Sequence, residues 1–250
     1  MRARQRHFNP RVMGATLVLD SRYISGLSDG NAIGSWPDKS GNAYDPTQAT
    51  AAAKPTYKTA IQGGNPVARF DGGDSLYKNQ NLSTVNALTY IITCSFTSNV
   101  SRNMVFDAKN YAGAGFASHG LEQNTYNTAG QRYGQYTSGG AYDSGTATSS
   151  GMKIISAAAN TTSGNNVVNN TTYRVQGNTS ALNSRFRTQY ANLSNVNGFM
   201  VGAFNNGGSA AFVFHNGDIA QIIVLPSNTT GAPMKRMEHA AAYSFKIACN

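Results

Sequence analysis

The chain has 250 residues, enough for one large β-sandwich or two small domains, and carries a formal net charge of +9. Hydrophobic residues make up 40% of it, whereas charged residues make up only 12%, against roughly a quarter in an average globular domain. No stretch approaches the roughly 20 apolar residues of a membrane span, and no dense Lys/Arg stripe follows residue 11. A membrane protein and a specific nucleic-acid-binding body are therefore not expected.

The chain begins with a basic arm, because Arg2, Arg4, Arg6 and Arg11 lie within its first residues. Such an arm commonly holds an acidic protein surface or nucleic acid, and a solvated tail is the alternative. We expect residues 1–14 to form this arm and residues 15–250 to form a single domain. No apolar segment of a secretory signal follows the arm, so we expect synthesis in a host cytoplasm.

Short β-rich runs separated by Gly and Asn recur along the chain, as in a sandwich or jelly roll. They predict strands at Thr16–Asp20, Val67–Phe70, Ser75–Tyr77, Leu88–Phe96, Met104–Phe106, Lys153–Ala159, Thr171–Gln176, Arg185–Tyr190, Phe199–Phe204, Ala211–Phe214 and Ile219–Leu225. After the last run, Thr230 can cap a helix over residues 232–247. The helix would face the sandwich with four apolar residues at helical spacing, Met234, Met237, Ala241 and Phe245.

Residues 36–42 read Trp-Pro-Asp-Lys-Ser-Gly-Asn, a sequence typical of a tight turn. We expect Trp36 to bury its ring under this loop, while Asp38, Ser40 and Asn42 bond backbone groups of the turn. Stacking of Trp36 on a ligand is the alternative. Arg69 is expected to pair with Asp71 or with a neighbouring acid.

The order of these motifs resembles the concanavalin A-like lectin/glucanase, or LamG-like, jelly-roll superfamily. The turn at residues 36–42 is followed by Gly64–Gly72, which reads Gly-Asn-Pro-Val-Ala-Arg-Phe-Asp-Gly, and Gly217–Val224 resembles the family's last strand before a closing helix. The resemblance covers roughly residues 15–76 and 198–248. It implies an all-β, concanavalin A-like sandwich with a short C-terminal α-helix, and it says almost nothing about function.

Many members of this superfamily hold Ca²⁺ at the rim of the sandwich, and this ion requires oxygen ligands. Asp71 and Asp74, separated by two glycines, are the best candidates here; a hairpin turn whose Asp side chains bond the backbone is the alternative. No Cys/His cluster suggests zinc, and we interpret Cys94 and Cys249 as free thiols. No other cofactor is expected.

Glucanases of this superfamily place two carboxylates on one strand, about 5–5.5 Å apart for retention or 6.5–9.5 Å for inversion. This chain has two glutamates, Glu122 and Glu238, and no second acid lies two to four residues from either. We therefore do not expect an enzyme. A hydrolase or lyase that uses Asp residues from different loops is the minor alternative.

The middle of the chain places tyrosines among Gly, Ser, Asn and Gln, a composition typical of adaptable binding surfaces. The candidates for contact with a sugar are Tyr126, Tyr133, Tyr136 and Tyr142. Ordinary cross-strand packing of these rings is the alternative.

Two functions follow from these features. The favoured one is a non-enzymatic virion structural protein, such as a phage capsid decoration, fibre or adhesion component, whose partners are other virion proteins or copies of itself. The basic arm, the missing signal and the low charge favour it. The alternative is a carbohydrate-binding, lectin-like module, secreted or at a cell surface, which grips a glycan with its Tyr-rich loops.

Overall fold

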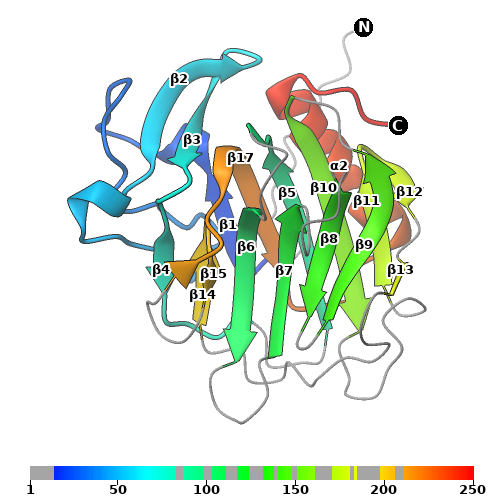
Figure 1. The fold of residues 1–250 in the computed structure, drawn as a ribbon. Helices are drawn as coiled ribbons and strands as arrows, with labels where there is room; N and C mark the ends of the chain where they lie inside the picture. The colour runs from blue at the N-terminus through cyan, green and yellow to red at the C-terminus, as the bar shows by residue number, and fades with distance from the viewer. Residues whose placement is uncertain are drawn as a thin grey trace, which may run out of the picture.

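The computed structural model describes residues 14–82, 87–97, 103–110, 117–123, 132–137, 140–147, 151–160, 171–180, 183–184, 198–205 and 211–250. The basic arm and the strand predicted at Arg185–Tyr190 lie outside these ranges. The described residues form two antiparallel sheets packed face to face, with one α-helix behind the rear sheet (Figure 1). The predicted all-β sandwich with a short C-terminal helix is confirmed.

The rear sheet, sheet A, has eight strands among the described residues, in the order β12-β11-β10-β5-β17-β3-β2, with β1 also paired to β17. Its strands are β1 (Leu17–Asp20), β2 (Thr56–Gln62), β3 (Asn65–Asp71), β5 (Ala87–Cys94), β10 (Lys153–Asn160), β11 (Thr171–Val175), β12 (Asn178–Ser180) and β17 (Asn216–Leu225). β5 and β17 lie at its centre and are buried along nearly their whole length, because both of their faces are covered.

The front sheet, sheet B, has seven strands among the described residues, in the order β13-β9-β8-β7-β6-β14-β4. Its strands are β4 (Leu76–Lys78), β6 (Asn103–Asn110), β7 (Ala117–Gln123), β8 (Arg132–Thr137), β9 (Gly140–Ala147), β13 (Asn183–Ser184) and β14 (Gly198–Val201). A short hairpin of β15 (Phe204–Asn205) and β16 (Ala211–Phe212) follows β14. Two short 3-10 helices, η2 (Ser21–Tyr23) and η3 (Ala51–Ala53), lie in the N-terminal third.

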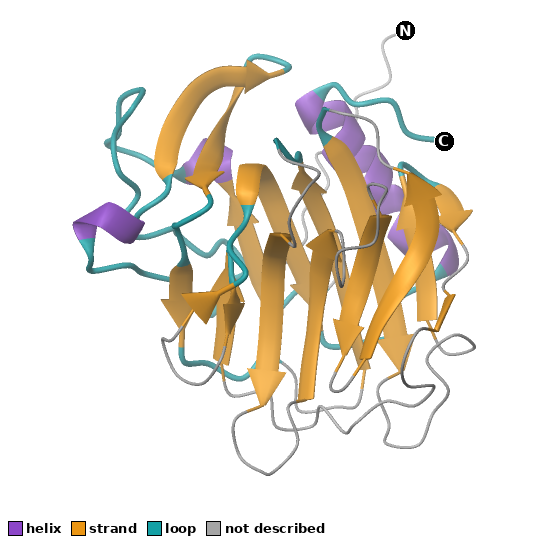
Figure 2. Cartoon of the chain, viewed as in Figure 1, coloured by secondary structure: helices purple, strands orange, loops and turns teal. Residues whose placement is uncertain are grey.

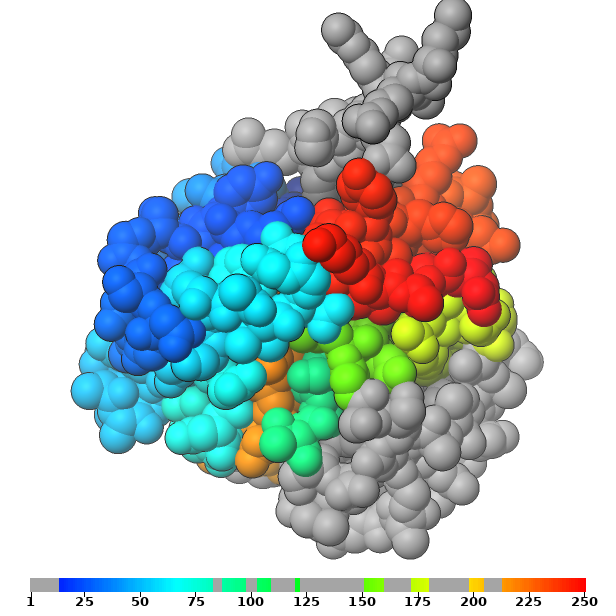
Figure 3. Space-filling view, turned by 90° about the horizontal axis from the view of Figure 1, so that it is seen from above, coloured from blue at the N-terminus to red at the C-terminus, as the bar shows by residue number. Residues whose placement is uncertain are grey.

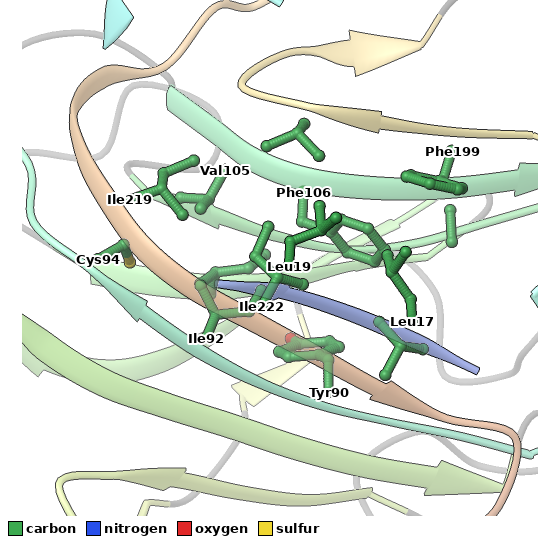
Figure 4. Packing of buried hydrophobic residues seen from close by; sticks show 14 of the residues in the cluster. Leu17, Leu19, Tyr90, Ile92, Cys94, Val105, Phe106, Phe199, Ile219 and Ile222 are labelled. Atoms are coloured by element: carbon green, nitrogen blue, oxygen red, sulfur yellow. The ribbon is translucent and has the colours of Figure 1, made fainter. Parts of the chain in front are cut away.

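The main core fills the space between the two sheets (Figure 4). Alternate residues of β5 face it, so that Tyr90 and Ile92 contact this core while Ile91 between them faces the other way. Sheet B contributes Phe106 and Phe199, whose rings lie 6.1 Å apart. Successive side chains of the central strand β5 therefore alternate between the main core and the opposite face of sheet A.

Helix α2 (Gly231–Phe245) covers the outer face of sheet A (Figures 1 and 2). Its four predicted apolar residues are all buried, and Met237 packs with Ile91 and Ile223 in a second core. The helix ends at Lys246, whose left-handed backbone (φ 52°) lets its N–H reach the carbonyls of the last turn. None of the helices in the described ranges is long and apolar enough to cross a bilayer.

Candidate functional site

A row of directly paired residues runs across sheet B. Tyr77 of β4 lies opposite Met200 of β14, Met200 lies opposite Asp107 of β6, and Asp107 lies opposite Gly120 of β7. Residues that are directly opposite in an antiparallel pair share one face of the sheet. The four residues therefore form a continuous strip on one face, which we call the outer row.

The outer row lies on the face of sheet B that points away from the main core. The strand neighbours of its members, Phe106, Leu121 and Phe199, all belong to that core, and side chains alternate between faces along a strand. Asp107 and Met200 are nevertheless fully buried, whereas Tyr77 is partly exposed. Asp107 also interacts with another group of the protein.

Gly120 is required in the row because strands β6 and β7 approach each other closely there. A Cβ atom on Gly120 would lie 2.3 Å from the carbonyl oxygen of Phe106 and 3.2 Å from the Cα of Asp107. The register of the pair also shifts between Met104 and Phe106, as at a β-bulge. Gly120 therefore leaves the position beside Asp107 without a side chain.

The outer row combines an aromatic ring, a carboxylate, a flexible thioether and a position with no side chain. Ligand sites in proteins typically join apolar and aromatic surface to a few fixed polar groups. The ring of Tyr77 can pack against the apolar face of a ring-shaped ligand, and burial raises the pKa of its hydroxyl above the ordinary value. The carboxylate of Asp107 is fully shielded from solvent, so Tyr77 is the member of the row with a described side chain that is open to a ligand.

The four tyrosines predicted to bind a ligand are only partly placed by the structure. Tyr136 lies opposite Gly120 in the register of β7 and β8, so it continues the outer row by one strand. Tyr133 lies on β8 and Tyr142 on β9. The side chains of these three residues, and the whole of Tyr126, lie outside the described part of the chain.

The turn at residues 36–42 is joined to the edge of β1. The carboxylate of Asp38 accepts hydrogen bonds from the backbone N–H of Val18 (2.9 Å) and of Ser40 (2.8 Å). Asn42 donates from its side chain to the carbonyl of Thr16, at 3.0 Å. These bonds satisfy backbone groups of β1 and of the turn itself.

Trp36 lies in the main core and is fully shielded from solvent. Its backbone N–H donates to the carbonyl of Pro46 at 3.1 Å, while the indole N–H has no hydrogen-bond partner in the described structure. At this position the ring cannot stack on a ligand at the surface.

Arg69 forms a bidentate ion pair with Asp218, its cross-strand partner on β17, at 2.7 and 2.9 Å. It does not pair with Asp71. The predicted neighbouring acid is therefore Asp218. It is distant from Arg69 in the sequence, and the register of the sheet brings the two residues together.

Asp71 and Asp74 bond the backbone of their own turn. Asp74 accepts from the N–H of Asp71 at 3.0 Å, and Asp71 accepts from the N–H of Gly73 at 2.9 Å. This is the geometry of the hairpin-turn alternative. Among the residues whose side chains are described, no group of three or more His, Cys, Asp and Glu could hold a metal ion. Calcium at this turn stays a prediction, to be tested by calorimetric titration with Ca²⁺.

Asp74 gives the turn a pH dependence. Burial raises the pKa of its carboxyl group to about 6, the N–H of Asp71 acts in the opposite direction, and the nearby charge of Asp71 adds to the rise. A raised carboxyl pKa favours the protonated form in the folded state, so this contribution to stability is present below the ordinary pKa and lost as the pH rises through about 6.

We therefore expect the melting temperature of Asp74→Asn to rise relative to the wild type as the pH increases from about 4 to 7, because the asparagine does not ionise. Thermal unfolding of both proteins followed by circular dichroism over this range measures the difference. A difference that stays constant with pH would contradict the assignment of the raised pKa to Asp74.

Both cysteines are free in the structure, Cys94 in the main core and Cys249 near the C-terminus. Burial raises the pKa of the Cys94 thiol far above its ordinary value, so that this thiol stays protonated.

No protein-family model matches this sequence, and no curated protein does. Solved structures do resemble it. Domain 4 of AbnA, a GH43 extracellular arabinanase from Geobacillus stearothermophilus in complex with arabinotriose, matches with a TM-score of 0.57 and 11% identity. That match covers 87% of this chain and 94% of the domain.

Two larger enzymes also match. An arabinofuranosidase complexed with arabinofuranosyl-α-1,2-xylobiose gives a TM-score of 0.63 at 13% identity, with 86% of this chain and 51% of that chain covered. Trypanosoma rangeli sialidase in complex with sialic acid gives 0.59 at 12% identity, with 94% and 34% covered. This chain therefore spans about half and about a third of the two enzymes.

These comparisons correct the expected family. The proteins that the chain resembles in structure are an arabinanase domain, arabinofuranosidases and a sialidase, so the specific assignment to the concanavalin A-like, LamG-like superfamily is replaced by an all-β sandwich of the kind found in glycoside hydrolases. Turn motifs such as residues 36–42 fix a local backbone geometry, and unrelated sandwiches can share such a turn.

The expectation of a non-enzymatic virion structural protein, such as a phage capsid decoration or fibre, is corrected on the same ground, because these neighbours are carbohydrate-active. So is the expectation that the chain is not an enzyme. The argument against catalysis required both carboxylates on one strand, whereas a folded sandwich can bring together carboxylates from different strands and turns. At these identities the likeness shows the fold alone.

Proposed function

We propose that this chain is a carbohydrate-active β-sandwich that binds an oligosaccharide over the outer row of sheet B. The observation that carries the proposal is the match to Domain 4 of AbnA, because it extends over nearly the whole of a domain that was solved with arabinotriose. The larger enzymes share only part of their length with this chain, and they too act on sugars.

The chemistry of the outer row supports the same proposal. Tyr77, the partly exposed member of the row, offers an aromatic ring to the apolar face of a sugar, whereas the carboxylate of Asp107 is fully buried beside it. At Gly120 strands β6 and β7 approach each other closely, and Tyr136 continues the row on the next strand, β8. Because Asp107 and Met200 are buried, we infer that the sugar contacts the partly exposed Tyr77 first.

Tyr77→Ala is expected to weaken the binding of arabinotriose by about 1–2 kcal/mol, roughly five- to thirtyfold in Kd, because it removes the aromatic platform. Isothermal titration calorimetry measures the change. Tyr23→Ala is the matched control, since Tyr23 is 52% exposed on η2, away from sheet B, and its loss should leave the Kd unchanged. Equal affinity of Tyr77→Ala and the wild type would refute a site at the outer row.

Glycoside hydrolysis is the second candidate, because the arabinofuranosidases and the sialidase that the chain resembles are hydrolases. The carboxyl group of Asp74, with a pKa of about 6, has the property of a general acid near neutral pH. The backbone carbonyl of Asp74 lies beside Gly202, two residues beyond Met200 of the outer row. Release of arabinose from arabinotriose by the wild type, lost in Asp74→Asn, would support hydrolysis with Asp74 as the general acid, because a sugar leaving group must be protonated. If the wild type binds arabinotriose but releases no arabinose from it, hydrolysis is refuted and sugar binding stays the proposed function.

A further inference from the structure

Helix α2 presents a basic and aromatic stripe on the side that faces away from sheet A. Its exposed side chains recur at helical spacing and include three cations, a histidine and a tyrosine: Lys235, Arg236, His239, Tyr243 and Lys246. We call these five residues the α2 stripe. Tyr243 is 70% exposed, more than any other large hydrophobic side chain in the described structure.

The positive charge of the α2 stripe is not balanced within the described part of the protein. The only acid on the helix, Glu238, is buried and pairs with Arg174 on β11. The other carboxylates with described side chains interact with groups inside the protein: Asp20, Asp29, Asp38, Asp45, Asp71, Asp74, Asp107 and Asp218. The described Asp and Glu side chains thus interact within the protein, and none of the described ion pairs includes Lys235, Arg236 or Lys246, while His239 contacts the backbone oxygen of Asn250 at 3.3 Å.

The three cations of the α2 stripe lie in two groups along the helix. Lys235 and Arg236 lie in the second turn of α2, and no acid occupies the first turn. Lys246 adopts a left-handed conformation at the other end, a role that glycine usually fills. The stripe therefore carries positive charge near both ends of the helix, with the exposed Tyr243 between the two groups in the sequence.

The surface beside the stripe is firm. Gln62 and Asn65 at the tip of the β2–β3 hairpin donate hydrogen bonds to the carbonyls of Phe245 (2.8 Å) and Ser244 (2.7 Å). Figure 3 shows the C-terminal end of the chain at the surface beside this hairpin. The last turn of α2 is therefore held in one place by the neighbouring hairpin, so that Tyr243 and Lys246 are presented on a fixed backbone.

We propose that the α2 stripe binds an acidic polysaccharide, whose carboxylate groups pair with Lys235, Arg236 and Lys246 while a sugar ring packs on Tyr243. Charge complementarity argues for a polyanion, and an exposed aromatic ring among cations suits a charged sugar chain. The inference rests on the proposed function for the sugar class. It adds a second surface, because α2 covers sheet A and the outer row lies on sheet B.

The test measures binding to polygalacturonate and to neutral galactan by biolayer interferometry. The wild type is expected to bind polygalacturonate, to bind it less as the salt concentration rises, and to ignore galactan. Lys235→Ala/Arg236→Ala should weaken this binding by about tenfold and Tyr243→Ala by about fivefold. These side chains are exposed, so circular dichroism should show unchanged unfolding.

The matched control is Lys39→Ala/Lys54→Ala, which removes the same net charge from a region outside α2 and should bind like the wild type. The inference is overturned if this control loses as much affinity as the α2 double variant, if galactan binds equally well, or if polygalacturonate does not bind. Tighter binding of duplex DNA with the same dependence on Lys235 and Arg236 would also overturn it, in favour of a nucleic acid. The affinity of the α2 variants and of the wild type for arabinotriose is measured in parallel. If even the wild type does not bind arabinotriose, the proposed site at the outer row fails, whatever the result with polygalacturonate.

Discussion

Replacing Glu238 with alanine is expected to lower the free energy of unfolding by about 3–5 kcal/mol, because it leaves a buried arginine without its counter-charge. Arg174 donates from Nε to the two carboxylate oxygens of Glu238 at 2.8 and 3.1 Å, and Ser156 donates to the same carboxylate. All three residues are buried, and they join α2 to β10 and β11. Urea denaturation followed by circular dichroism measures the loss.

The control is the double variant Glu238→Leu/Arg174→Met, which replaces both charges with apolar side chains of similar size. Removing the whole pair avoids the uncompensated charge, so the double variant should be at least about 2 kcal/mol more stable than Glu238→Ala. If Glu238→Ala loses less than about 1 kcal/mol, the ion pair does not form between helix and sheet as described.

Trp36→Ala is expected to cost about 3–5 kcal/mol, the usual loss when a large aromatic side chain is removed from a packed core. Trp36 is among the largest fully buried side chains and belongs to the core between the two sheets. Guanidinium denaturation measured by circular dichroism gives the change, since this variant lacks the chain's only tryptophan.

Trp36→Phe separates the ring from its polar group. Phenylalanine keeps an aromatic ring in the core and removes an indole N–H that has no partner, so its loss should stay below about 1.5 kcal/mol. A cost for Trp36→Ala near that of a surface substitution would show that residue 36 is exposed in solution, and it would reopen its alternative role in stacking on a ligand.

Much of sheet A could be predicted from the sequence, because burial on both faces gives nearly continuous apolar strands. The run predicted at Ile219–Leu225 lies within β17, and the helix predicted over residues 232–247 is α2 (Gly231–Phe245). In contrast, β2 and the three strands β7, β8 and β9 were missed. β7 reads Ala-Ser-His-Gly-Leu-Glu-Gln, in which Leu121 is the one large apolar residue, so its sequence lacks the alternating apolar pattern that identifies a strand.

The candidate site was harder to predict than the fold. The sequence places Asp107 inside an apolar run, Met-Val-Phe-Asp-Ala. A charged side chain is rarely buried, so an acid at this position indicates that one face of the strand has a role besides hydrophobic packing. That signal could have identified Asp107. Its neighbours Tyr77 and Met200 come from distant parts of the chain, however, and only the strand register brings them together.

The central claim, that an oligosaccharide binds over the outer row, is tested most directly by mapping amide chemical shifts of the labelled protein during titration with arabinotriose. We predict progressive shifts at Tyr77, Asp107, Met200 and Gly120, with no change along α2. Saturating titration without shifts on sheet B, or with shifts confined to another surface, would contradict the account.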